Sequence, residues 1–154
     1  MNLRRLILPG VFVALVAGTS LATDPPGTSV TPAALLERLD DGAAAPYVLD
    51  VRTAEEYVSG HVPGAVNIPY DKLAARLAEV PKDRDVVLYC RSGRRAQIAG
   101  EVLADNGYAR LAYLQGDMPA WADQGRPVEK PRDPAACAAA LASGGPTEQA
   151  CASN

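Results

Sequence analysis

The sequence predicts an α/β fold of three layers, in which a mostly parallel central sheet is flanked by helices. Short apolar runs rich in β-branched residues, such as Val86 to Tyr89, alternate along the chain with segments whose leucines recur at helical spacing. Near-continuous apolar runs of this length are typical of parallel strands buried on both faces. A length of 154 residues suits one main domain.

Thr31 is expected to be the N-cap of the first helix, because a proline follows it at the first helical position, and Gly42 is expected to end that helix. The next run, Tyr47 to Val51, indicates a buried parallel strand. Asp50 and Arg52 stand at its C-terminal end, where ligands bind in open α/β sheets. We interpret the two as a structural ion pair that fixes the following loop.

Thr53 and Glu56 have the spacing of a capping box, which predicts a short helix. A short strand is expected over Ala65 to Ile68, and leucine spacing predicts a helix over Pro69 to Val80. His61, the one histidine, lies in a Gly-His-Val-Pro-Gly turn. We expect it to hydrogen-bond a loop, because no nearby histidine or cysteine would complete a metal site.

Cys90 follows the strand Val86 to Tyr89 and opens a tight loop, Arg91-Ser92-Gly93-Arg94-Arg95. Amides of such a loop, running into a helix N-terminus, point inward and form an anion-binding nest. The helix dipole and the three arginines favour the thiolate over the thiol, and Gly93 lets the backbone curl. The pattern indicates a reactive cysteine, and the alternative is a buried structural one.

A helix is expected over Ala96 to Asn106, ended by Gly107, with Ile98, Val102 and Leu103 facing the sheet. The last strand is expected over Arg110 to Leu114. A loop and a short helix should follow, and we interpret Trp121 as the packing anchor of that helix.

The first 22 residues have the pattern of a signal peptide: two arginines, an apolar run and a small-x-small site that predicts cleavage after Ala22. An uncleaved membrane anchor is the alternative, although the apolar run Leu6 to Val16 is short for a span. Residues 23–30 are expected to be a flexible lead-in. Export predicts the periplasm, an oxidising compartment, and no stable membrane insertion after cleavage.

A C-terminal extension is expected over residues 129–154. Asp133 and Pro134 predict the start of a helix over Ala135 to Ser143, and Thr147 could begin a further turn. Export would allow Cys137 and Cys151 to form a disulfide that folds the extension into a helical hairpin, contributing about 3 kcal/mol. The alternative is a disordered, alanine-rich end.

The cysteine loop resembles the active-site loop of the rhodanese (thiosulfate sulfurtransferase) family. Two other stretches agree with that family. The first is Leu49-Asp50-Val51-Arg52 with Glu55-Glu56-Tyr57 and residues 60–69, and the second is Leu114-Gln115-Gly116-Asp117 with Trp121 and residues 125–128. Together with the cysteine loop, they cover about residues 31–128, the whole of one rhodanese domain. One departure is Gln115-Gly116, where the family often has two glycines. We expect this departure to leave the cysteine loop untouched.

The resemblance implies a rhodanese-like fold and a double-displacement sulfur transfer with Cys90 as nucleophile and carrier. The residues that it implies for donor binding are Arg91, Ser92, Gly93, Arg94 and Arg95. The donor would be thiosulfate or a similar small molecule, and the acceptor cyanide, a thiol or a protein sulfur acceptor. No metal and no cofactor are expected.

Two other function classes stay open. A cysteine-dependent phosphatase or arsenate reductase has the signature Cys-x5-Arg, which needs arginine at the position of Ala96. A non-catalytic rhodanese-like module would bind a partner without chemistry. Nucleic acid is not an expected partner, because the formal net charge is −3 and no basic block is present.

Overall fold

A computed structural model describes residues 27–144, 151 and 152. The predicted signal peptide, the first half of the lead-in and the turn expected from Thr147 lie outside these residues. Within them, no helix combines the length and the apolar character that crossing a membrane requires.

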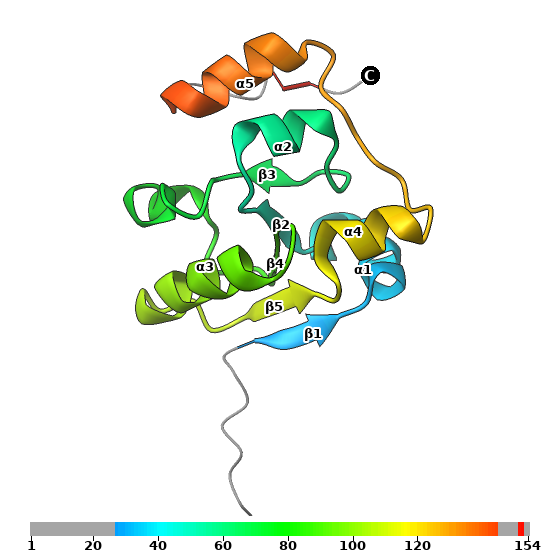
Figure 1. The fold of residues 1–154 in the computed structure, drawn as a ribbon. Coiled ribbons are helices and arrows are strands. Elements are labelled where there is room, and N and C mark those ends of the chain that lie inside the picture. The colour runs from blue at the N-terminus through cyan, green and yellow to red at the C-terminus, as the bar shows by residue number, and fades with distance from the viewer. Residues whose placement is uncertain (1–26, 145–150, 153–154) are drawn as a thin grey trace, which may run out of the picture.

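A parallel sheet of five strands forms the middle layer, with the strand order β1-β5-β4-β2-β3 (Figure 1). The strands are β1 (Thr28–Val30), β2 (Tyr47–Asp50), β3 (Val66–Asn67), β4 (Val86–Tyr89) and β5 (Leu111–Leu114). All four strand pairs are parallel, so the carboxyl ends of the strands meet at one edge, where such sheets bind ligands.

The strands separate two cores because successive side chains point to opposite faces. Val87 and Tyr89 of β4 enter the core that is covered by α1 (Pro32–Leu39), α2 (Ala54–Ser59), α4 (Asp117–Asp123) and α5 (Pro134–Ser143). Val86 and Leu88 enter the other core, under α3 (Arg94–Asp105), and Cys90 lies there too. Figure 1 shows α1 and α3 on opposite sides of the sheet, so the expected three layers are confirmed.

Two predicted helix starts are confirmed by their hydrogen bonds. Thr31 Oγ1 accepts from Ala34 N at 3.2 Å at the start of α1. In the capping box of α2, Thr53 Oγ1 accepts from Glu56 N at 3.3 Å, and Glu56 Oε2 accepts from Thr53 N at 3.1 Å. Each bond satisfies an amide that has no partner inside its helix.

The prediction of a flexible lead-in over residues 23–30 is wrong for the last three residues. Thr28–Val30 form the edge strand β1, in which Val30 pairs with Leu114. Val30 alone of the three is buried, so the segment has no apolar run. The segment is a strand because its backbone pairs with β5, and the pattern of its side chains does not reveal such pairing.

The helix predicted over Pro69 to Val80 is also wrong. The segment forms two short 3₁₀-helices, η2 (Leu73–Ala75) and η3 (Leu77–Glu79). The Tyr108 hydroxyl donates to the carbonyl oxygen of Leu77, at 2.6 Å, so a distant side chain satisfies a group that a continuous helix would satisfy itself.

Ile98 does not face the sheet as expected, because 37% of it is exposed. The buried side of α3 consists of small residues and one leucine: Ala96, Ala99, Gly100 and Leu103. A Cβ added at Gly100 would collide with the Tyr113 hydroxyl. Close packing on the sheet therefore buries the side of α3 that carries small residues, and not the side that carries Ile98.

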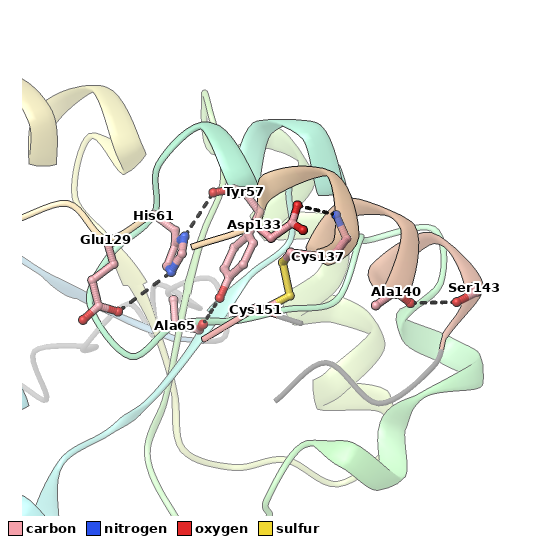
Figure 2. The surroundings of a disulfide bond; sticks show 10 residues. Tyr57, His61, Ala65, Glu129, Asp133, Cys137, Ala140, Ser143 and Cys151 are labelled. Carbon is pink, nitrogen blue, oxygen red and sulfur yellow. Dashed lines mark hydrogen bonds and ion pairs between the residues drawn. A yellow bond between two sulfur atoms is a disulfide. The ribbon is translucent and has the colours of Figure 1, made fainter. Parts of the chain in front are cut away.

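The C-terminal extension packs on α2, and its predicted disulfide between Cys137 and Cys151 is confirmed (Figure 2). Cys137 and Leu141 are buried in the same core as Tyr57. Asp133 Oδ1 accepts from Ala136 N at 3.0 Å, which caps α5 as expected. The second arm of the predicted hairpin lies outside the described residues.

Candidate active site

Cys90 follows β4 directly, and its side chain is fully buried. The amides of Ser92 and Gly93 donate to its sulfur, with N–Sγ distances of 3.4 and 3.2 Å. Gly93 has a φ of 82°, in the left-handed region that favours glycine. The loop therefore curls around Sγ with amides directed at it, which is an arrangement that stabilises negative charge on sulfur.

The three loop arginines have different surroundings. Arg91 and Arg94 are exposed, whereas Arg95 is partly buried. Arg95 donates two hydrogen bonds to Glu56, of 2.6 and 2.9 Å. The pKa of Arg95 is raised, chiefly by these bonds and further by the charge and hydrogen bonding of Cys90. Arg95 therefore faces the thiol, but its charge is already matched by a carboxylate.

Glu56 is a residue of this site that sequence reasoning missed. Its pKa is lowered to about 2, mainly by the hydrogen bonds from Arg95. The same carboxylate completes the capping box of α2. In the sequence, Glu56 stood in the capping box and in a stretch that resembles the rhodanese family. Neither pattern indicates a partner 39 positions away.

Asp117 was also missed. Its Oδ1 accepts from the Cys90 amide at 2.7 Å, and the next amide, of Met118, donates to the Cys90 carbonyl oxygen at 3.1 Å. The turn between β5 and α4 thus holds both backbone polar groups of Cys90. These contacts come from Asp117 and Met118, so the expectation that Gln115-Gly116 leaves the cysteine loop untouched stays a prediction.

Two consecutive residues, the N-cap and the first residue of α4, have left-handed backbone conformations. Gly116 and Asp117 have φ angles of 73° and 56°. These are the consecutive left-handed positions that suit glycine, and aspartate is among the few other residues that tolerate them. Asp117 is therefore the non-glycine member of this left-handed pair, and it lies next to the cysteine loop.

The expected ion pair between Asp50 and Arg52 is confirmed, and both residues are buried. Burial works to lower the pKa of Arg52, but hydrogen bonding and charge from Asp50 outweigh it and raise that pKa. Arg52 Nη2 also donates to the Gly60 carbonyl oxygen at 2.8 Å, and the Tyr89 hydroxyl donates to Asp50 Oδ2 at 2.7 Å. This network anchors the loops that follow β2 and α2.

The ring of His61 does not hydrogen-bond a loop as expected, because its partner is a residue of helix α2. Its ring stacks on Tyr57 with a centroid distance of 3.7 Å, and its Nδ1 lies 3.0 Å from the Tyr57 carbonyl oxygen (Figure 2). Its Nε2 lies 3.8 Å from Glu129. Burial lowers the pKa of His61, and the ring packs against Tyr57.

Residues 31–124 match the family model of the rhodanese-like domain. The chain belongs to the rhodanese-like family. A protein named "Sulfurtransferase" from Allochromatium vinosum is 43% identical over 84 residues, which are 54% of this chain and 78% of that protein. The thiosulfate sulfurtransferase PspE of Escherichia coli is 41% identical over 75 residues, 47% of this chain and 72% of that protein.

Other rhodanese-like relatives have different roles. The HTH-type transcriptional regulator Rv0324 of Mycobacterium tuberculosis is 39% identical over 119 residues, 77% of this chain but 51% of the regulator. A crystal structure of a rhodanese-related protein from Thermoplasma volcanium is 29% identical, with a TM-score of 0.59, and covers 66% of this chain and 96% of that one. The fold and family expected from the sequence are therefore confirmed.

Proposed function

We propose that the protein transfers a sulfane sulfur from thiosulfate, or a similar donor, to cyanide or a thiol through a persulfide on Cys90. The observation that carries this proposal is the pair of loop amides directed at a single sulfur, at 3.4 and 3.2 Å. These amides can hold a thiolate before transfer and a persulfide after it, because backbone donors stabilise whichever sulfur anion occupies the ring.

In the first step, the Cys90 thiolate attacks the outer sulfur of thiosulfate. The new S–S bond forms as the S–S bond of thiosulfate breaks, and sulfite leaves with the bonding electron pair. In the second step, the acceptor attacks the outer sulfur of the persulfide. When cyanide is the acceptor, it is released as thiocyanate and the Cys90 thiolate is regenerated. The cycle therefore needs no oxidant, reductant or cofactor.

The exposed arginines provide the entry side for an anionic donor. Arg91 and Arg94 belong to the loop that holds the buried thiol, and no carboxylate of the described residues forms an ion pair with them, so their charges can attract the donor's sulfonate. Arg95 does not serve as a free charge, because Glu56 accepts two of its hydrogen bonds. Its proposed role is to hold positive charge next to Sγ.

The experiment that tests this function is the intact mass of the protein after incubation with thiosulfate. The natural chain is expected to gain one sulfur and to lose it again when cyanide is added, with release of thiocyanate. Cys90→Ser should gain none. Ser92→Ala keeps both the cysteine and the backbone amide, so it should still gain the sulfur.

Failure of the natural chain to take up sulfur from thiosulfate and from other sulfane donors would overturn the proposal. It would favour a non-catalytic binding module, the reading that the likeness to a transcriptional regulator supports. A phosphomonoester assay run in parallel tests the phosphatase class, for which Ala96 occupies the position of the required arginine.

We further propose that the protein is exported and acts in the periplasm, with a thiol or a protein as sulfur acceptor. The Cys137–Cys151 disulfide supports this, because structural disulfides persist in oxidising compartments. Cell fractionation tests the location, and the mass of the purified chain tests cleavage after Ala22. A full-length chain in the cytoplasm would contradict both the periplasmic location and the cleavage.

A further inference from the structure

The carboxylate of Asp117 lies against the backbone of the cysteine loop, close to Cys90 and Gly93. Its Oδ1 is 2.7 Å from the Cys90 amide nitrogen, and its Oδ2 lies 3.3 Å from the place where a Cβ on Gly93 would stand. Both residues are next to the sulfur, because Cys90 carries it and the Gly93 amide donates to Sγ at 3.2 Å. Covalent geometry keeps an amide nitrogen within roughly 4 Å of the Sγ of the same residue, so the Asp117 oxygen is within roughly 7 Å of the sulfur.

The charges around the sulfur leave this carboxylate unmatched. Arg95 is paired with Glu56, and Arg91 and Arg94 are exposed. Among the described residues, no lysine or arginine forms an ion pair with Asp117. Asp117 is 8% exposed, so solvent screens its charge weakly. Within the described part of the chain, Asp117 therefore places a carboxylate beside the loop with no ion-pair partner.

The turn does not need a carboxylate for its shape. A glycine would adopt the φ of 56° at position 117 without strain, whereas aspartate there is tolerated only because its short polar side chain bonds locally. What aspartate adds is an acceptor for the Cys90 amide and a charge close to the reacting sulfur. The charge acts on the donor as well as on the thiol.

We propose that Asp117 determines the charge specificity of the sulfur donor: it disfavours doubly charged donors and favours singly charged ones, such as organic thiosulfonates. This inference rests on the proposed sulfur transfer. With a thiosulfonate, the Cys90 thiolate attacks the outer sulfur, the donor S–S bond breaks, and an organic sulfinate leaves with the electron pair. The two donors react alike and differ in charge, so a fixed carboxylate near the sulfur separates them electrostatically.

The decisive variant is Asp117→Asn, which keeps the oxygen acceptor and tolerates the left-handed backbone but removes the charge. The ratio of kcat/KM for thiosulfate to kcat/KM for benzenethiosulfonate is expected to rise about tenfold. Glu101→Gln, on the exposed side of α3, makes the same change in net charge away from the loop and should leave the ratio unchanged.

A second readout does not depend on sulfur transfer. It compares the rates at which iodoacetate, which is anionic, and iodoacetamide, which is neutral, alkylate Cys90. The rate ratio of iodoacetate to iodoacetamide should rise in Asp117→Asn and stay constant in Glu101→Gln. A chain that transfers no sulfur but shows this rise would refute the proposed function and keep the charge effect of Asp117.

Equal changes with both donors and with both alkylating agents would overturn the inference, because they would show that Asp117 serves the loop structure alone. Should Asp117→Asn not fold, Asp117→Gly gives the same test, since glycine suits the backbone and also lacks the charge. The same rise in both ratios is expected for that variant.

Discussion

Arg95 and Glu56 form a two-pronged ion pair, with N–O distances of 2.6 and 2.9 Å, that joins the first turn of α3 to α2. Because Arg95 also interacts with the Cys90 sulfur, the pair links the position of α2 to the charge beside the thiol. Two-pronged guanidinium–carboxylate pairs fix orientation as well as charge.

Arg95→Lys should slow persulfide formation about tenfold and cost about 1 kcal/mol of stability. Lysine keeps the charge but has no planar fork to donate both hydrogen bonds to Glu56, so its charge is held less firmly beside the thiol. Stopped-flow measurement of sulfur uptake and urea unfolding test this. Arg94→Lys is the matched control, because Arg94 is exposed. Equal rates in the two variants would mean that the fork of Arg95 is not needed.

The Arg95–Glu56 pair should survive mild acid. The pKa of Glu56 falls from 4.5 to about 2, chiefly through its hydrogen bonds from Arg95. A carboxyl whose folded pKa is depressed contributes stability that is present above pH 4.5 and is lost as the pH falls towards 2. The stability difference between the natural chain and Glu56→Gln should therefore stay constant above pH 4.5 and shrink below it. A difference that disappears already near pH 5 would contradict this, and urea midpoints across that range measure it.

Removal of the Cys137–Cys151 disulfide should cost about 3 kcal/mol, the loop-entropy value for a closed loop of this length. The comparison is between the natural chain and the double variant Cys137→Ala/Cys151→Ala in urea unfolding. A reductant should lower the stability of the natural chain and leave that of the double variant unchanged. Unfolding midpoints that coincide without reductant would show that the bridge adds nothing.

Asp50→Asn should cost about 3 kcal/mol, because it leaves the buried charge of Arg52 without a counter-charge. Tyr89→Phe removes only the hydroxyl bond to Asp50 and the acceptor for the Val62 amide. It should cost about 1 kcal/mol. Chemical unfolding distinguishes the two. Similar losses in both variants would show that hydrogen bonds, and not charge, hold this network.

Much of the fold was predictable because it depends on local patterns. The apolar run of β4, the capping box at Thr53 and the N-cap at Asp133 were each indicated by neighbours in the sequence. The errors arose where a distant group decided the outcome. Tyr108 bonds the segment that was expected to be a helix, and β5 pairs with a polar segment that has no strand pattern.

The sequence by itself determined that a cysteine ends a buried strand and that its loop, through Gly93, can direct amides at the sulfur. These features depend on chain geometry over a few residues. The tertiary structure alone decided which carboxylates lie around that sulfur. Glu56 and Asp117 lie 39 and 27 positions from their partners Arg95 and Cys90. They reach the loop because the parallel order of the sheet brings the carboxyl ends of β2, β4 and β5 together at one edge.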